Sequence, residues 1–393
     1  MTVRVNKSAF NIREKLSELE RPIGVKGNEL MRAETLQDAR DFISAGRRNL
    51  IINGDMQAAQ RSTSSSTIIG NNYRTLDRWR IQFAGYTTVV GSTSQSSESP
   101  PGFSNSLRVN VTTAETLASS DLASIRQRVE AQDCQQFAYG TSQAKTLTLS
   151  FWIRSSVTGT YTIGLYQTDD ARQVTLPYTV DNADTWEHKV ITIPPDTTGV
   201  IDNDNGTGLE ISWNLSAGST YKGTDHTGWG AYANGRWANG QTADIAGTLS
   251  NLYLTGVQLE VGKNATDFEH RSYGEELALC QRYFHMIANS ANHGIVAMHA
   301  YTSTAVYGVY RPPVEMRDNP ILFEQDVTNG LQLYGNNAAQ SINGNSIFLN
   351  TLRNKPNVVR MEVTSSISVV QGYSYWLETN TGASFVLGLD AEL

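Results

Sequence analysis

From residue 49 onward, apolar and polar residues alternate in short runs that are separated by Gly, Ser, Thr, Asn and Asp. In residues 147–153 one parity is wholly apolar and consists of Leu147, Leu149, Phe151 and Ile153. Such alternation is typical of strands whose sheet buries one face. Because no long helical pattern separates the runs, we expect a sandwich or jelly roll rather than an alternating β–α fold.

The same reading assigns most of the middle of the chain to strands. Predicted strands cover residues 49–53, 76–83, 107–111, 147–154, 161–166, 186–193, 209–215 and 249–261. A Gly-containing turn at 157–159 predicts that the two runs around it form a hairpin. Residues 60–72, 92–104 and 216–248 are rich in turn formers and are predicted to be loops. Trp79, Trp186 and Trp213 fall on core positions of this pattern.

The run at residues 249–261 is predicted to be the last strand of this region. Leu252 and Leu254 share one parity, whereas Val257 and Leu259 share the other, so the strand has one apolar and one mixed face. Turn residues follow, and then a short helical pattern places Leu277, Cys280 and Phe284 on one side. We therefore expect a β-domain over residues 49–271 and a connecting helix within residues 272–290.

A third region, residues 291–393, again alternates in short runs. Predicted strands cover residues 294–301, 305–310, 321–323, 331–334, 346–349, 358–363 and 373–377. The pattern predicts a second, smaller β-domain. Because its strands are short and would leave exposed edges, we expect it to associate with other copies, as an oligomeric tip.

Residues 1–48 differ from the rest, because they contain ten Lys and Arg against seven Asp and Glu and so carry a charge of +3. Since the whole chain has a net charge of −7, residues 49–393 carry −10. Two short helices are predicted here. Their apolar stripes consist of Ile12, Leu16 and Leu19 in the first and of Leu36, Phe42 and Ile43 in the second. Helices of two or three turns need a partner surface in water. That surface is either the chain's own β-domain or, as the charge contrast favours, a symmetry axis or another protein that these residues anchor to.

Composition excludes several classes of protein. Among 393 residues only 18% are charged and the net charge is −7, which argues against a nucleic-acid partner. No apolar run is long enough for a membrane span, and the first residues lack the core of a secretory signal, so we expect synthesis in a cytoplasm. Cys134 and Cys280 are expected to be buried free thiols, with a single bridge as the alternative.

Residues that could carry catalysis or bind a metal have ordinary structural explanations. Glu260, Glu269, Glu275 and Glu276 lie close in sequence, but the last two begin a helix and the others follow surface parity. The six histidines are scattered without metal-ligand spacing. Asp202, Asp204 and Gly206 partly resemble a calcium loop, but the distal glutamate is misplaced. We predict a protein that is not an enzyme and has no cofactor, and the sequence leaves metal binding open.

The remaining candidates are aromatic. Sugar rings stack on Trp and Tyr while neighbouring polar groups bond the hydroxyls. Trp152 lies on the parity opposite the aliphatic residues of its strand, and Trp229, Tyr232 and Trp237 lie in the long segment 216–248. These four residues are the candidates for glycan contact. The alternatives are that a loop covers Trp152 and that the other three fold back as a plug over the sandwich.

Several segments also carry a resemblance to a known group of proteins. They are LYLTGVQLEVG, ATDFEHRSYGEELALCQRYF, RRNLIINGDMQAAQRSTS and YRTLDRW. Together they resemble the carbohydrate-binding-module-like jelly-roll domain of tail fibres and related virion proteins of tailed bacteriophages, over roughly residues 47–286. The opening MTVRVNKSAFNIREKL is similar to the start of such proteins in marine phages.

The resemblance implies a non-enzymatic virion protein of the tail-fibre or receptor-binding type, located on the phage particle. It implies a homotrimer that is attached to other tail or virion proteins through residues 1–48, with residues 291–393 as the distal tip. Host surface polysaccharide is the partner it suggests, although the residues leave open whether sugar is bound at all. The alternatives are a purely structural tail or capsid decoration and, less favoured, a glycan depolymerase. Related jelly rolls often hold calcium through acids in the closing strand, where this chain has Thr255 and Gly256.

Overall fold

The computed structural model divides the chain into two compact units, Met1–Arg48 and Asn49–Leu393. The residues that it describes are 48–223, 228–291, 293–325, 330–335, 338–342, 347–349, 355–364, 369–380 and 386–393. The predicted anchor residues Ile12, Leu16, Leu19, Leu36, Phe42 and Ile43 lie outside the described residues. The second unit is mainly β, as predicted, and contains two hydrophobic cores.

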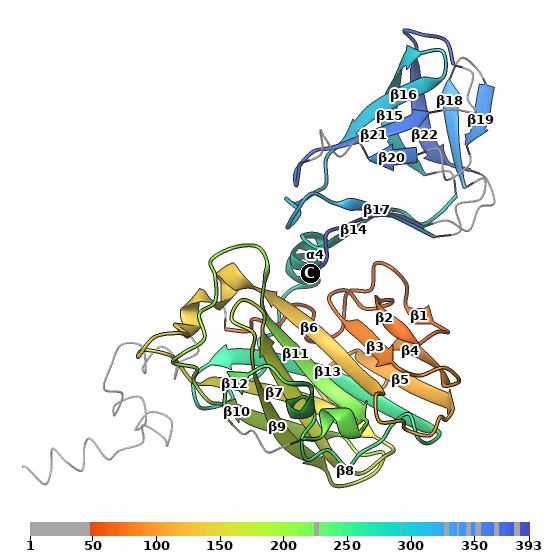
Figure 1. Ribbon diagram of the computed structural model, residues 1–393. Coiled ribbons are helices and arrows are strands. Elements are labelled where there is room, and N and C mark those ends of the chain that lie inside the picture. Colours follow the sequence, from red (N-terminus) through yellow and green to blue (C-terminus); the bar gives the residue numbers. More distant parts are fainter. Residues whose placement is uncertain are drawn as a thin grey trace, which may run out of the picture. The chain divides into compact units, whose positions relative to one another are not determined.

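Two sheets, which we call A and B, lie face to face and enclose the first core (Figure 1). Sheet A contains, in spatial order, β1 (Ser64–Ser65), β4 (Val90–Ser96), β5 (Ser106–Thr113), β13 (Ser250–Val261), β7 (Leu147–Ser155) and β10 (Glu187–Ile193). Sheet B contains β12 (Gly230–Ala231), β9 (Arg172–Val180), β8 (Gly159–Gln167), β11 (Thr207–Ala217), β6 (Leu122–Glu130), β3 (Arg80–Ala84) and β2 (Gly70–Tyr73).

Aromatic side chains join the two sheets through this core. Trp213 of β11 lies 5.4 Å from Trp79 and 5.9 Å from Phe151 of β7, measured between ring centroids. Trp79 and Trp213 are buried, as their positions in the pattern predicted. Aromatic pairs in edge-to-face or tilted contact stabilise a core by about 1 kcal/mol beyond the area that they bury.

The closing strand β13 contains a bulge that the sequence pattern did not reveal. Its register against β7 shifts between Thr255 and Gln258, and Gly256 there has φ +61°. The extra residue brings Val257 and Leu259 onto the same inward face as Leu252 and Leu254, and all four are buried. The predicted mixed face therefore does not exist, because a bulge reverses the parity of every residue that follows it.

Several sequence-based assignments in this sandwich were wrong or incomplete. The predicted hairpin does not form, because β7 belongs to sheet A and β8 to sheet B. Residues 49–53 form no strand, although Leu50 N donates to Leu259 O. The predicted loops 60–72 and 92–104 contain β1, β2 and part of β4. Strand β9 was missed, because Pro177 and its polar neighbours weaken the strand pattern at a position near the sheet edge.

The connecting helix is shorter than its apolar pattern suggested. Helix α4 (Tyr273–Gln281) begins with a capping box in which Ser272 Oγ accepts from Glu275 N and Glu275 accepts from Ser272 N. Its buried residues are Glu276 and Cys280, whereas Phe284 begins the next strand. Cys134 and Cys280 are both buried free thiols.

Sheets C and D surround the second core. Sheet C contains β14 (Phe284–Ala288), β23 (Val386–Asp390) and β17 (Ile321–Gln325). Sheet D contains β19 (Ala338–Ile342), β18 (Leu331–Gly335), β22 (Ser374–Thr379), β15 (Gly294–Thr302), β16 (Ala305–Tyr310), β21 (Val359–Thr364) and β20 (Ile347–Leu349). The strands predicted after residue 293 are present, and β14, β19 and β23 were missed. The domain boundaries drawn from the sequence stay a prediction, because Asn49–Leu393 is one compact unit.

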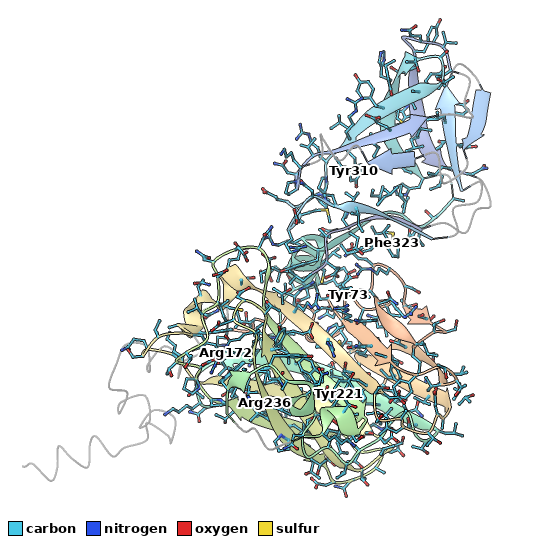
Figure 2. The ribbon with its side chains drawn as sticks, in the orientation of Figure 1. Tyr73, Arg172, Tyr221, Arg236, Tyr310 and Phe323 are labelled. Atoms are coloured by element: carbon cyan, nitrogen blue, oxygen red, sulfur yellow. The ribbon has the colours of Figure 1, made fainter. Side chains whose placement is uncertain are left out.

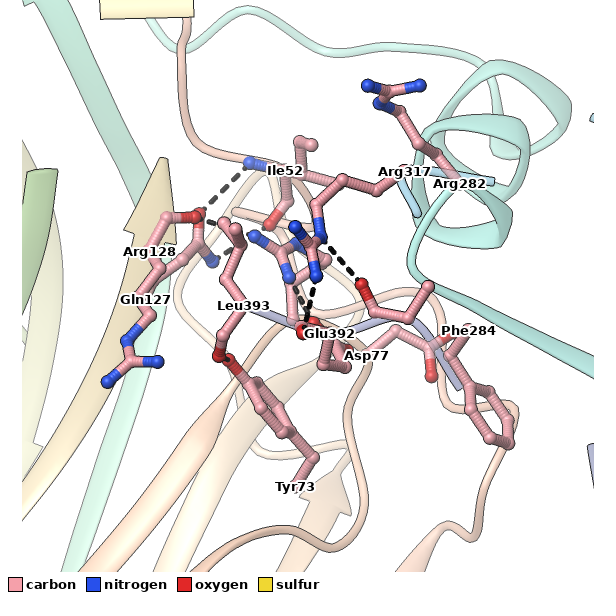
Figure 3. Close-up of polar contacts among 12 residues, drawn as sticks. Ile52, Tyr73, Asp77, Gln127, Arg128, Arg282, Phe284, Arg317, Glu392 and Leu393 are labelled. Atoms are coloured by element: carbon pink, nitrogen blue, oxygen red, sulfur yellow. Dashed lines mark hydrogen bonds and ion pairs between the residues drawn. The ribbon is translucent and has the colours of Figure 1, made fainter. Parts of the chain in front are cut away.

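A buried ionic cluster ties the end of the chain to the first sandwich. Arg61 Nη2 lies 3.0 Å from Asp390 Oδ2, and its Nη1 lies 3.3 Å from Glu392 Oε1 and 3.7 Å from Asp77 Oδ1. Arg78 also pairs with Glu392. Figure 3 shows Glu392 beside Asp77, and Leu393 beside Tyr73, whose hydroxyl donates to Leu393 O at 3.3 Å. The positive and negative side chains of this cluster pair with one another, as buried charges require.

Substitution of Gly256 tests the bulge. In Gly256→Ala the new Cβ would lie 2.6 Å from Phe103 Cζ and 3.0 Å from Trp152 Cδ1, at a backbone conformation that disfavours L side chains. We expect the free energy of unfolding in urea to fall by about 2–4 kcal/mol. Gly240→Ala is the control, since Gly240 has a comparable φ of +80° but a Cβ there meets open space, and it should cost only the backbone strain of about 1–2 kcal/mol. Equal losses in the two variants would contradict the packing role of Gly256.

Asp77 should make stability pH-dependent. Burial raises the pKa of Asp77 from 3.8 to about 6, against the opposing effect of Arg61. Between these values the folded chain holds a proton that the unfolded chain has lost, so this contribution to stability falls as pH rises from about 4 to 6. In Asp77→Asn this change in the free energy of unfolding, up to about 3 kcal/mol between about pH 4 and 6, should be absent, as measured by urea unfolding followed by fluorescence. Identical slopes in the two proteins would refute the assignment.

Candidate functional site

The outward side of sheet B carries polar side chains in rows across neighbouring strands. The inward positions of β8, β11 and β6 are filled by the core, so the alternate positions face away from it. The strand register places Gln173, Tyr166, Glu210 and Arg128 in one row. It places Thr175, Gly164, Ser212, Arg126 and Arg80 in the next. A third row contains Thr162, Asn214, Ser124 and Gln82.

The segment that follows β11 crosses part of this side. Asn214 Nδ2 donates to Trp237 O at 2.8 Å, and Gln173 Nε2 donates to Ala233 O at 3.1 Å. At Gly164 a Cβ would lie 3.3 Å from Trp237 O, so the missing side chain leaves room for the segment. Short 3-10 helices η2 (Ser219–Tyr221) and η3 (Asn234–Arg236) lie together, and Figure 2 shows Tyr221 and Arg236 on the same side of the sandwich.

Next to this segment Glu210 pairs with two arginines, and a third arginine lies on the neighbouring strand. Glu210 Oε1 accepts from Arg126 Nη1 and Glu210 Oε2 accepts from Arg128 Nε, each at 2.6 Å. Burial alone would raise the pKa of Glu210, but the two guanidinium groups outweigh it and hold the pKa below its usual value. Arg80 is directly opposite Arg126 in the strand register. Burial and the neighbouring Arg128 lower the pKa of Arg80.

Three aromatic rings lie beside these charges. The ring centroids of Tyr166 and Tyr232 are 5.3 Å apart, and that of Trp237 lies 6.1 Å from Tyr166 and 6.2 Å from Tyr232. The Arg126 guanidinium lies over Trp237, 4.9 Å from the ring centroid. Tyr232 is 48% exposed, whereas Trp237 is 5% exposed and packs against both tyrosine rings. We call Tyr166, Tyr232, Trp237, Arg80, Arg126, Arg128 and Glu210 the sheet B site.

Sequence reasoning found two members of the sheet B site, Tyr232 and Trp237, and missed the other five residues. The missed residues stand on the outward parity of β3, β6, β8 and β11. That parity was visible in the sequence as polar residues between core positions. Their convergence was not visible, because it depends on which strands are neighbours in the sheet.

The structure places Trp229 away from this site. Its side chain packs against the first core, its ring lies 5.7 Å from that of Tyr139, and its Nε1 donates to Pro194 O at 2.7 Å. These contacts match the plug alternative for Trp229 and leave its indole N–H satisfied.

Trp152 lies on the outward side of sheet A, apart from the other candidates. Its ring is 5.0 Å from that of His188, and it packs near Phe103 over Gly256. Trp186 was assigned to the core from its sequence position, and this was wrong. Trp186 is only partly buried and makes an edge contact with Tyr253, because it precedes β10 rather than lying within it.

The four carboxylates that sequence proximity suggested are held in structural roles. Glu260 accepts from Thr266 N at 2.8 Å and is buried, so its predicted surface position was wrong. Glu269 accepts from Asn49 N at 2.7 Å, Glu275 closes the capping box, and buried Glu276 accepts from Asn53 N.

The partial calcium motif takes part in a contact with the region after β16. Asn205 Nδ2 donates to Arg317 O at 2.7 Å and Arg317 Nη1 donates to Asn205 O at 3.0 Å. Within the described ranges, no group of three or more His, Cys, Asp or Glu is placed to hold a metal ion. Nor do those ranges contain a helix of the length and apolarity that crossing a membrane requires.

Comparisons with known proteins give structural likenesses only. No protein-family model matches the chain, and no curated protein matches its sequence. The chain is similar to the enzymatically active domain of tailspike protein 4 of bacteriophage CBA120, with 13% identity and a TM-score of 0.31 over 55% of this chain and 21% of that one. It spans about a fifth of that tailspike chain.

Carbohydrate-binding modules are also among the similar structures. A CBM4 module matches with 14% identity and a TM-score of 0.30 over 53% of this chain and 98% of the module. The family 11 module of a Clostridium thermocellum cellulase matches with 14% identity and a TM-score of 0.26 over 51% and 99%. The chain is thus similar to such modules over about half its length.

Proposed function

We propose that this protein binds carbohydrate, without cleaving it, at the sheet B site. The observation that carries the proposal is the meeting of an exposed aromatic side chain with the partly exposed side chains of Tyr166, Arg128 and Arg80. Tyr232 is 48% exposed and rests on Tyr166 and Trp237. Its hydroxyl donates to Asn234 Oδ1 at 2.7 Å, which fixes the ring for stacking.

The dimensions and chemistry of the site suit a chain of sugars. From the partly exposed Tyr166 on β8 to the partly exposed Arg80 on β3 the site crosses three strand spacings of about 4.8 Å, or about 14 Å in total. Sugar rings present apolar faces to aromatic side chains, and their hydroxyls accept and donate hydrogen bonds. The guanidinium groups of Arg80 and Arg128 supply donors, and the Gln82 Oε1 atom has no hydrogen-bond partner among the described residues.

Binding rather than hydrolysis is proposed because of the state of Glu210. Glycoside hydrolysis uses two carboxyl groups at a defined separation, one of them with a raised pKa. Glu210 is the one carboxylate in the described rows of the sheet B site, and Arg126 and Arg128 lower its pKa. A carboxylate held in this way is a poor proton donor.

Paired substitution of the two tyrosines tests this function. We expect Tyr166→Ala with Tyr232→Ala to weaken binding at least tenfold on a glycan array and in affinity electrophoresis, since each lost stacking contact removes about 1 kcal/mol or more. Tyr273→Ala is the matched control, because Tyr273 is similarly exposed at 54% but begins α4. Glycan binding that survives in the double variant would place the site elsewhere.

We also propose that the protein is a component of a phage particle, of the tail-fibre type. The sequence segments that resemble virion proteins support this, as does the division of the chain into a separate first unit, Met1–Arg48. Residues 1–48 would attach the protein to other virion proteins, and several copies, a homotrimer by the same resemblance, would bind host polysaccharide together. Multivalent attachment makes weak single-site contacts strong.

Outward apolar side chains on sheet D support association between copies. Tyr334 and Trp376 are directly paired across β18 and β22, and they are 48% and 57% exposed. Exposed aromatic residues grouped in this way are typical of surfaces that contact a partner. A structural decoration without a receptor role would use the same surface, so the two roles differ at the sheet B site.

Particle incorporation tests the virion proposal. In the full chain, Leu16→Asp with Phe42→Asp places charge on both predicted anchor stripes. We expect this variant to be absent from particles in immunogold labelling with an antibody to residues 291–393, while the wild-type protein labels the particle surface. Normal incorporation of the variant would contradict the anchor, and unlabelled wild-type particles would contradict the virion role itself.

A further inference from the structure

We propose that the glycan bound at the sheet B site is acidic, and that it presents a carboxylate or sulfate group to Arg80 and Arg128 while a sugar ring stacks on Tyr232. This inference rests on the proposed carbohydrate-binding function and specifies its ligand class. The shared chemistry is an anionic oxygen cluster, which a uronic acid or a sulfated sugar can supply.

The first observation is a local excess of positive charge. Arg126 and Arg128 pair with the single carboxylate of Glu210, and Arg80 lies opposite Arg126 on the next strand, so the site has two more positive charges than negative ones. The chain as a whole has a net charge of −7, so this excess is not a general property of its surface. A local cationic site on an otherwise acidic protein raises the concentration of anionic ligands at that site.

The second observation is the position of Arg80. It is directly opposite Arg126 across β3 and β6, on the same side of the sheet. Like charges in this arrangement destabilise a strand pair. Within the part of the chain that the structure describes, the Arg80 side chain makes no hydrogen bond or ion pair, and Arg80 is only partly exposed. An anion placed between Arg80 and its neighbours would remove this repulsion.

The third observation is the set of unused donors around the same point. Arg128 uses Nε for Glu210, and neither of its terminal nitrogens has a hydrogen bond to a described residue. The two terminal nitrogens of a guanidinium group lie side by side and can donate to two oxygens of a carboxylate or sulfate.

These groups are held in place before any ligand arrives. Glu210 fixes Arg126 and Arg128 at 2.6 Å, and the Arg126 guanidinium packs on the Trp237 ring that supports Tyr232. The anion-binding and ring-stacking parts therefore share one support. Preorganisation of this kind lowers the entropy cost of binding.

The test measures binding of the full chain to polymers that differ only in charge. Polygalacturonate and its fully methyl-esterified form share a backbone, as do dextran sulfate and dextran, so the two pairs separate a carboxylate from a sulfate source. We expect the acidic member of at least one pair to bind, and its neutral partner to bind at least tenfold more weakly. Added salt should weaken that binding, since the attraction is electrostatic and partly exposed.

Three variants assign the effect to residues. Arg80→Gln should weaken binding of the acidic polymer about tenfold or more, as expected for loss of a charge-assisted hydrogen bond. Arg154→Gln is the control, since Arg154 lies on sheet A and pairs with the exposed Glu98. Tyr166→Ala with Tyr232→Ala should abolish binding of acidic polymers as well.

The possible outcomes separate this inference from the proposed function. Equal binding of acidic and neutral polymers, unchanged in Arg80→Gln but lost in the tyrosine double variant, would overturn the acidic ligand and keep carbohydrate binding. Acidic binding that persists in the double variant, or that Arg154→Gln reduces as much as Arg80→Gln, would overturn the sheet B site. Failure to bind any of a broad set of acidic and neutral glycans would overturn both.

Discussion

The pairing of Glu210 with Arg126 and Arg128 is the interaction on which the sheet B site depends. Both hydrogen bonds are 2.6 Å long, and Glu210 is 3% exposed. Removal of one partner from such a buried arrangement leaves an uncompensated charge and typically costs about 3–5 kcal/mol. The Arg126 guanidinium also packs over the Trp237 ring, so the same pairing positions the aromatic residues of the site.

The fold explains why these groups face outward and stay rigid. Trp213, Phe151 and Trp79 fill the space between sheets A and B, which leaves the alternate residues of β6 and β11 on the outer side. The bulge at Gly256 keeps all the aliphatic residues of the central strand β13 in that core. Arg61 and Arg78 then tie the chain end to the sandwich through Asp390 and Glu392.

The sequence predicted what depends on local pattern. The mainly β fold, the strands Ala305–Tyr310 and Leu331–Gly335, and the helix that has Glu275 and Glu276 at its start were all readable from alternation or spacing. It did not predict what depends on pairing between distant strands. The β7–β8 turn is local, but each strand finds its partners in a different sheet, and the convergence of Arg80, Arg126 and Glu210 requires the order β11–β6–β3. No local pattern encodes that order.

The most direct measurement is a crystal structure of the full chain with an acidic oligosaccharide bound. The account predicts density for a sugar ring against Tyr232 and Tyr166, with the acidic group within hydrogen-bond distance of the Arg80 or Arg128 guanidinium. It also predicts that the Glu210 contacts to Arg126 and Arg128 are unchanged by the ligand. Density on the outer side of sheet A beside Trp152, with the sheet B site empty, would contradict it.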